Sequence, residues 1–250
     1  MIGGIWLTEQ VALIGSGEIG LSQTHDCHVY LVDTGEGGIL FDAGAGIEPE
    51  LIVENIHSLG FPEDQLTHLF LTHCHPDHAG GAAYFQTILN VQVCAGERTA
   101  KPLIAGDEMA TSLVPAREEG IYPANYHLQS LSKVDILRDG ERLQFGDMVL
   151  EVLETPGHSA DSICYRVRLA QGWALFCGDT LCADGRLTLL NTYDSNPTDF
   201  RRSIQRLANI TVDGLFPGHG LFLLSNAEAV IQELHNKLSR SIFLPPVLNQ

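Results

Sequence analysis

Basic residues are scarce in this sequence. Lysine and arginine together number 14 against 31 aspartates and glutamates, so the formal net charge is −17 at pH 7. Such a charge repels phosphate backbones unless a local basic patch overrides it. We therefore expect a small-molecule substrate and no nucleic-acid partner, and a divalent cation would offset the negative charge locally if the substrate were an anion.

Long apolar runs and Cys-x-x-Cys pairs are also missing. No segment reaches the roughly 18 apolar residues of a membrane-spanning helix, and the N-terminal residues lack the charged and apolar regions of a signal peptide. The six cysteines mostly lie in apolar, strand-like runs, which favours thiols in a reducing compartment over a disulfide framework. We expect a cytoplasmic protein without a membrane partner.

The composition is that of a globular protein with a sizeable core. The chain has 250 residues, of which 44% are hydrophobic and 18% charged, and this length suits one large domain. Both halves, roughly residues 1–127 and 128–250, run strands first and helices after. We predict a single domain over residues 1–250 with an α/β fold, in which two mixed β-sheets pack face to face with helices on both outer faces, an αββα sandwich.

Local patterns predict the main elements. Two β-rich runs around a glycine-rich turn indicate a hairpin, and a tight turn at Gly146-Asp147 joins two later strands. Helices are expected to begin near Asn196, which precedes a proline, and near Ser225, where Glu228 completes a capping box. Residues 97–127 are either a helical layer over the sheet or a partial lid over the site. The two runs of the hairpin are 27–33 and 39–42. The other predicted segments are a helix at 48–59 and strands at 67–72, 91–95, 134–137, 142–145 and 149–153.

One short stretch concentrates possible metal ligands. The segment His73-Cys74-His75-Pro76-Asp77-His78 places three histidines and a carboxylate within six positions, directly after a predicted strand. Donors held this close together must be desolvated, and a divalent cation is the simplest partner that satisfies all of them. Cys74 lies between two candidate ligands, but side chains of an extended segment alternate in direction, so it is expected to face the core.

Three further candidate ligands each follow a later strand-like run. These are His158, Asp179 and His219. One zinc ion takes about three or four protein ligands, so the full set is too large for one ion and suits two ions that share a carboxylate. Paired ions roughly 3.5–4 Å apart are a recognised hydrolytic device.

The order of these residues resembles the metallo-β-lactamase-fold superfamily, whose signature is His-x-His-x-Asp-His followed by a lone His, a lone Asp and a final His. The resemblance implies two zinc ions, with iron or manganese as alternatives. It assigns His73, His75 and His158 to the first ion and Asp77, His78 and His219 to the second. Asp179 would bridge the two, and Asp77 and Asp179 would be the catalytic carboxylates.

Asp42 lies where this family commonly has an aspartate that accepts the second N–H of a ligand histidine. A plain turn-capping role for Asp42 is equally open.

The short sequence motifs around the candidate ligands resemble those of the glyoxalase II and lactonase-like branch of this superfamily. That branch implies a metal-bridging hydroxide that cleaves an ester, a thioester or a lactone. The chain departs from glyoxalase II in lacking its basic C-terminal glutathione-binding region. It departs from homoserine-lactone hydrolases in having Cys182 where they commonly have tyrosine, which leaves Tyr193 and Arg186 as candidate substrate contacts. The segments that carry this resemblance are Thr72 to Gly81, Thr155-Pro156-Gly157-His158-Ser159, Gly178-Asp179-Thr180-Leu181 and Pro217-Gly218-His219-Gly220.

Several alternatives stay open at this point. A persulfide dioxygenase of the same fold needs only one iron and three protein ligands, whereas the complete set of seven donors favours two ions. A β-lactamase, an RNA-processing nuclease and a metal-binding module without activity are weaker alternatives. An apolar segment at 242–247 is a candidate contact in a homodimer.

Overall fold

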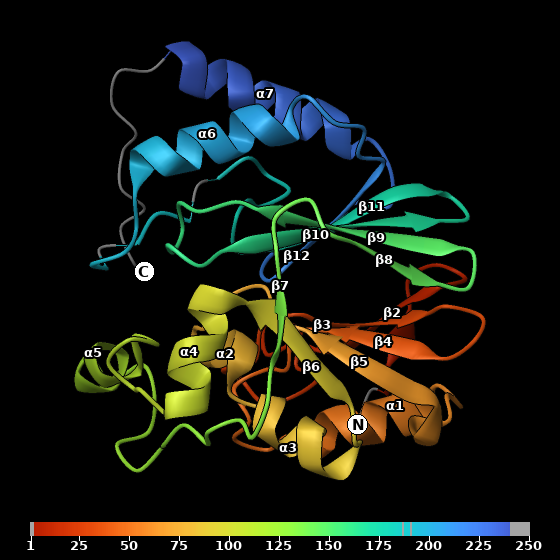
Figure 1. The fold of residues 1–250 in the computed structure, drawn as a ribbon, viewed down its shortest axis with the longest axis vertical. Helices are drawn as coiled ribbons and strands as arrows, with labels where there is room; N and C mark the ends of the chain where they lie inside the picture. The colour runs from red at the N-terminus through yellow and green to blue at the C-terminus, as the bar shows by residue number, and fades with distance from the viewer. Residues whose placement is uncertain (1–2, 187, 191, 241–250) are drawn as a thin grey trace. The chain divides into compact units, whose positions relative to one another are not determined.

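The computed structural model describes residues 3–186, 188–190 and 192–240. The chain divides into two compact units, residues 1–137 with 145–147 and residues 138–144 with 148–250. Each unit contains one β-sheet and its own helices (Figure 1). The assignment of both units to a single domain stays a prediction, and the apolar segment at 242–247 lies outside the described residues.

The first unit is built on a seven-stranded mixed sheet with the strands in chain order. Strands β1 to β4 pair antiparallel, and β4 to β7 pair parallel. The strands β2 to β4 are buried almost throughout, as expected for the centre of a sheet. The strands are β1 Ile5–Trp6, β2 Val11–Gly15, β3 Val29–Asp33, β4 Gly38–Phe41, β5 Leu66–Phe70, β6 Gln92–Gly96 and β7 Asp135–Leu137.

Helices of the first unit bury their apolar sides on this sheet. Ile52 and Ile56 of α1 and Phe85 of α3 join the same core cluster as the strand residues Leu31 and Leu69. Helix α4 contacts β6 and β7. The helices are α1 Glu50–Ser58, the 3₁₀ helix η1 Glu63–Gln65, α2 Pro76–Ala79, α3 Ala82–Ile88, α4 Glu97–Ala105 and α5 Leu113–Glu118.

The second unit has a five-stranded mixed sheet in the order β12-β11-β10-β9-β8. Helices α6 and α7 lie side by side over it (Figure 1). Phe200 and Ile204 of α6 and Leu234 of α7 pack in one core cluster with Leu175 of β11 and Leu215 of β12. The elements are β8 Arg142–Phe145, β9 Met148–Glu154, β10 Ile163–Leu169, β11 Gly172–Gly178, α6 Pro197–Leu207, β12 Gly214–Pro217 and α7 Ala227–Arg240.

Because of the strand directions, the candidate ligands in each sheet gather along the side of the sheet where the carboxyl ends of several strands lie. In the first unit, β4 and β5 are parallel neighbours, so Asp42 and the histidine motif leave the same edge. In the second unit, β9 and β11 both run antiparallel to β10 and are therefore parallel to each other, while β12 runs parallel to β11. The segments after β9, β11 and β12, which carry His158, Asp179 and His219, consequently leave one edge of that sheet.

Two mixed sheets with helices confirm the predicted α/β class. The hairpin of β3 and β4 and helix α1 are present as predicted, and Asn196 caps α6 by accepting hydrogen bonds from the amides of Thr198 and Asp199. Strands β1, β2 and β10 were not predicted. Among the described residues, no helix is long and apolar enough to cross a membrane.

The predicted capping box at the start of α7 is wrong. This helix begins at Ala227, two residues after Ser225. The amides of Ala227 and Glu228 donate to the carbonyl oxygens of Asp213 and Val212. Backbone groups from the loop before β12 therefore satisfy the free N–H groups of the first turn, and the serine is not needed as a cap.

Candidate metal centre

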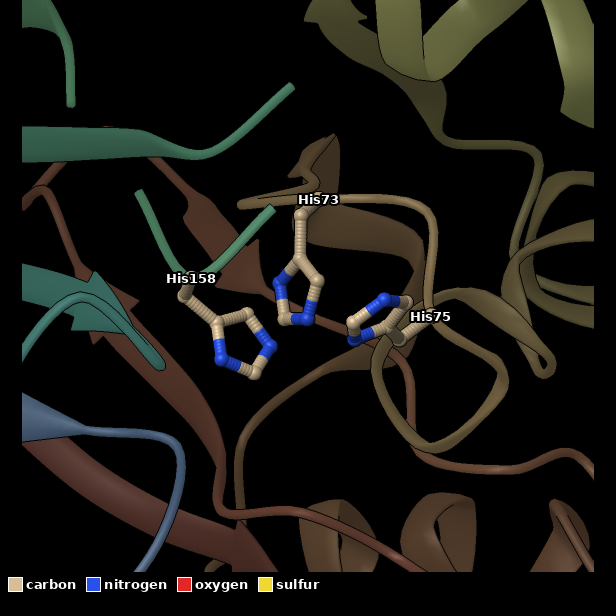
Figure 2. Close-up of side chains that lie close together, drawn as sticks. All are labelled: His73, His75 and His158. Carbon is tan, nitrogen blue, oxygen red and sulfur yellow. The ribbon is translucent and has the colours of Figure 1, made fainter. Parts of the chain in front are cut away.

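The histidine motif begins as an extended segment and ends as one helical turn. His75 has extended backbone angles, and α2 begins at Pro76, so Asp77 and His78 lie on the short helix. Figure 2 shows the imidazoles of His73 and His75 on the segment that follows β5, and that of His158 on the loop that follows β9. The ring centroid of His73 lies 4.6 Å from that of His75 and 4.2 Å from that of His78. The first unit thus brings four predicted ligands together.

Asp42 connects two of these histidines. Its Oδ2 lies 2.7 Å from Nδ1 of His78, and its Oδ1 accepts a 2.8 Å hydrogen bond from the amide of Thr72. The Thr72 hydroxyl donates to the same carboxylate and lies 3.0 Å from Nδ1 of His73. Asp42 is 3% exposed, so these are the bonds of a desolvated carboxylate. Of the two roles considered for Asp42, the structure shows the contact with a histidine of the motif, whereas the amide that its carboxylate accepts from belongs to Thr72 and not to the turn of Asp42 itself.

These contacts select the tautomers of both rings. The carboxylate of Asp42 can only accept, so Nδ1 of His78 carries the proton. The Thr72 hydroxyl uses its proton on Asp42, so its oxygen accepts from Nδ1 of His73. In both imidazoles Nε2 is then left with the lone pair, which is the form that binds a metal ion.

Close backbone contacts hold the motif against the segment that follows β4. The amide of Ala43 donates to the carbonyl of His78 at 2.7 Å, and the amide of Gly81 donates to Gly44 at 3.0 Å. A Cβ atom at Gly80 or Gly81 would collide with the carbonyl oxygens of Ala45 or Ala43. The two glycines after the motif are therefore required by this close approach.

The second unit brings the other three predicted ligands together. Nε2 of His158 lies 3.6 Å from Oδ2 of Asp179, and Nε2 of His219 lies 3.8 Å from Oδ1 of the same carboxylate. The amide of Gly218 donates to the carbonyl of Gly178 at 2.8 Å, which ties the end of β12 to the end of β11. Each oxygen of Asp179 is thus directed at a different histidine.

Thr188 was not predicted as part of the site. Its carbonyl oxygen lies 2.6 Å from Nδ1 of His158, and its hydroxyl donates to the carbonyl of Asp179. Because a carbonyl can only accept, Nδ1 of His158 is protonated and Nε2 carries the lone pair. No motif marks Thr188, which lies 30 residues after the histidine that it contacts.

The cysteines near the motif are buried. Cys74 packs in the hydrophobic core of the first unit, which confirms its predicted direction. Burial raises the pKa of the Cys27 thiol to about 12, so this thiol is protonated at neutral pH and lies as a neutral group beside His78. No disulfide joins any of the six cysteines, all of which lie in the described part of the chain.

The two predicted substrate contacts lie on the loop after β11. Tyr193 is 76% exposed. Nε of Arg186 pairs with a carboxylate oxygen of Asp184 at 2.5 Å, and both side chains are largely exposed. A substrate role for either residue stays a prediction.

Imidazole and carboxylate groups are the ligands of zinc-class ions. In the two units, seven such side chains follow the ends of strands, and three of the histidines have Nδ1 held by a partner. The donor chemistry of these residues therefore fits metal ions of this class.

Comparisons with known proteins agree with this donor set. The family model described as Metallo-beta-lactamase superfamily matches residues 23–219. The chain is 27% identical over 234 residues to a Bos taurus protein named acyl-coenzyme A thioesterase MBLAC2, and the match covers 86% of this chain and 79% of that protein. It is 30% identical over 183 residues to the hydroxyacylglutathione hydrolase of Pseudomonas paraeruginosa, with 73% of this chain covered. The chain spans only 58% of the length of that second relative.

A solved structure is similar over nearly the whole chain. BJP-1, a subclass B3 metallo-beta-lactamase of Bradyrhizobium japonicum, aligns with a TM-score of 0.72 at 22% identity and covers 95% of this chain and 91% of its own. At this identity the likeness shows the fold alone. It confirms the predicted metallo-β-lactamase fold.

Proposed function

We propose that this chain, which belongs to the metallo-beta-lactamase superfamily, is a dinuclear-metal hydrolase that cleaves a thioester, ester or lactone bond in a small molecule. That it is a hydrolytic enzyme agrees with relatives named as a thioesterase and as a hydroxyacylglutathione hydrolase. The same names favour a thioester among the three bonds. The net charge of −17 argues against a nucleic-acid substrate.

In this proposal His73, His75 and His158 hold one ion, and Asp77, His78 and His219 hold the other. Asp179 is shared. The observation that carries the shared role is the position of its two carboxylate oxygens. Oδ2 is near Nε2 of His158 and Oδ1 is near Nε2 of His219, and these histidines belong to different ligand sets.

When bound, a pair of zinc-class ions lowers the pKa of a water molecule and stabilises negative charge on a carbonyl oxygen. The protein's own groups supply orientation. Asp42 and Thr72 hold the rings of His78 and His73, and the carbonyl of Thr188 holds the ring of His158. In this proposal the carboxylates of Asp77 and Asp179, which are 21% and 12% exposed, are the candidate acceptors of the proton that an attacking water would lose.

Metal analysis with a substrate panel tests the proposal. The purified protein should contain close to two zinc-class ions per chain and should hydrolyse an acyl-coenzyme A, S-lactoylglutathione, an aryl ester or a lactone. Asp179→Ala should lose most of the second ion and most of the turnover. Asp64→Ala removes an exposed carboxylate of η1 and serves as the matched control, with metal content and rate unchanged.

A single iron per chain, together with oxygen uptake on glutathione persulfide, would overturn the proposal in favour of a persulfide dioxygenase. Full turnover in Asp179→Ala would contradict the shared role of this carboxylate while leaving the hydrolase assignment intact.

A further inference from the structure

Three aromatic rings pack together beside the histidine motif in the first unit. Tyr122 stacks on His25 with ring centroids 5.4 Å apart and lies 5.3 Å from the ring of Tyr126. His25 comes from the loop between β2 and β3, and both tyrosines follow α5. Tyr122 also packs with Ala45 and Leu113 in a small hydrophobic cluster. The Tyr122 ring is therefore held by two neighbouring rings and by apolar side chains.

Both supports of this ring are attached to the motif. On one side, the amide of Cys27, two residues after His25, donates to the carbonyl of Asp77 at 3.2 Å. On the other side, the hydroxyl of Tyr126 donates to the carbonyl of Ala45 at 2.5 Å and lies against the backbone of Gly80. The ring of Tyr122 is thereby fixed next to the turn that carries Asp77 and His78.

The Tyr122 hydroxyl has no assigned structural task. The residue is 7% exposed, yet its hydroxyl is not among the fully buried polar atoms, and among the described residues it takes part in no hydrogen bond. The neighbouring Asp77 side chain is 21% exposed. The ordinary pKa of a tyrosine hydroxyl is about 10, so this hydroxyl carries its proton at neutral pH and can donate it in a hydrogen bond.

We propose that the Tyr122 hydroxyl donates a hydrogen bond to the acyl oxygen of the substrate, where negative charge develops when water attacks. This inference rests on the proposed hydrolysis of an acyl compound. A thiolate leaves readily without protonation, whereas the oxyanion forms with a thioester, an ester or a lactone alike. A fixed neutral donor therefore contributes most at the acyl oxygen.

The test compares Tyr122→Phe with Tyr84→Phe in the metal-loaded protein. Phenylalanine keeps the stacked ring and removes only the hydroxyl. Tyr84 lies on α3, is partly buried and packs against the core of the same unit, and its hydroxyl likewise makes no hydrogen bond among the described residues, so it is the matched control. Tyr122→Phe should lower kcat/KM by about 10- to 100-fold, mainly through kcat, since one donor to an oxyanion is worth on the order of 100-fold or more. Tyr84→Phe should stay within about twofold of the parent.

A second readout needs no turnover. An alkyl phosphonate mimics the charged tetrahedral intermediate, and its dissociation constant should weaken in Tyr122→Phe by about the same factor as kcat/KM. Two metals per chain and an unchanged unfolding midpoint would show that the fold is intact.

The inference is wrong if Tyr122→Phe matches the parent in both kcat/KM and phosphonate binding. A parent protein that cleaves no member of the panel would instead overturn the proposed function. The two failures are therefore distinguishable.

Discussion

The imidazole Nδ1 of His78 lies 2.7 Å from Oδ2 of Asp42, although 36 residues separate them in the chain. Asp42 stands at the end of β4 and has a left-handed backbone with φ of 58°. This backbone turns the carboxylate toward the segment after β5, where it also accepts from the amide and hydroxyl of Thr72. The Nδ1 of His78 and the amide and hydroxyl of Thr72 therefore all depend on the one buried carboxylate of Asp42.

Replacing Asp42 by asparagine should weaken metal binding. Asparagine keeps the size of the side chain but removes the charge that supports His78, and removing such a partner of a ligand histidine typically costs about 10- to 100-fold in metal affinity. Competition with a zinc chelator measures the two dissociation constants. Asp33→Asn changes an aspartate that caps the turn after β3 and should leave both constants unaltered. Equal zinc affinity in Asp42→Asn and the parent would remove Asp42 from the metal centre.

Gly157→Ala should destabilise the second unit and displace His158. Gly157 has φ of 150°, and an added Cβ would collide with the backbone of Phe200 in α6. Unfavourable backbone angles cost about 1–3 kcal/mol and overpacking about 1–3 kcal/mol. Urea unfolding should therefore show a free energy of unfolding that is lower by at least about 2 kcal/mol, and the zinc content should be reduced. Gly60→Ala isolates the backbone cost, because Gly60 has φ of 73° and open space around it, and it should lose about 1 kcal/mol with zinc content unchanged. An equal decrease in the free energy of unfolding in the two variants would mean that α6 accommodates the added Cβ at position 157 without a measurable cost.

Glu108 should make the stability of the segment around α5 depend on acid pH. Burial acts to raise its pKa, but hydrogen bonds from His127, Arg117 and the amide of Leu128 outweigh this and lower the pKa below the ordinary value of 4.5. Both side-chain contacts are 2.9 Å long. A carboxyl with a lowered folded pKa stabilises the protein above its unfolded pKa, and this contribution is lost as the pH falls through the folded value.

The thermal unfolding midpoints of the parent and Glu108→Gln, measured from pH 6 to pH 3, check this effect. The advantage of the parent should be full above the ordinary pKa of 4.5 and should decrease as the pH falls below it. Glu233→Gln breaks a fully exposed pair with Lys237 and should give a smaller difference at every pH. A parent advantage that is as large at pH 3 as at pH 6 would show that the charge of Glu108 is not its source.

The candidate ligands were predictable because their placement is a local property. His73, His158, Asp179 and His219 each follow a run of apolar residues that forms a strand. The carboxyl ends of strands that run in the same direction meet at one edge, so a short pattern in the sequence fixes where the side chain leaves the sheet. The cap of α6 was predictable for the same reason, since Asn196 acts on amides two and three residues ahead.

Contacts between distant segments could not be predicted in this way. The stacking of Tyr122 on His25 and the hydrogen bond from His158 to the carbonyl of Thr188 depend on the path of whole loops. The cap of α7 failed because its amides find carbonyls more than a dozen residues earlier. Strands β2 and β10 were missed because they lead to no candidate ligand, although their local signal was present: Val11–Gly15 is a continuous apolar run, and Ile163–Leu169 ends in alternating apolar residues and arginines.

The close contact between the histidine motif and the segment after β4 has a thermodynamic consequence. The amides of Ala43 and Gly81 join the two segments, and the lack of a side chain at Gly80 allows them to touch. The conformational entropy of the ligand-bearing turn is thus lost when the first unit folds. Little of it is left to lose when an ion arrives, so the free energy of coordination is not spent on ordering the chain.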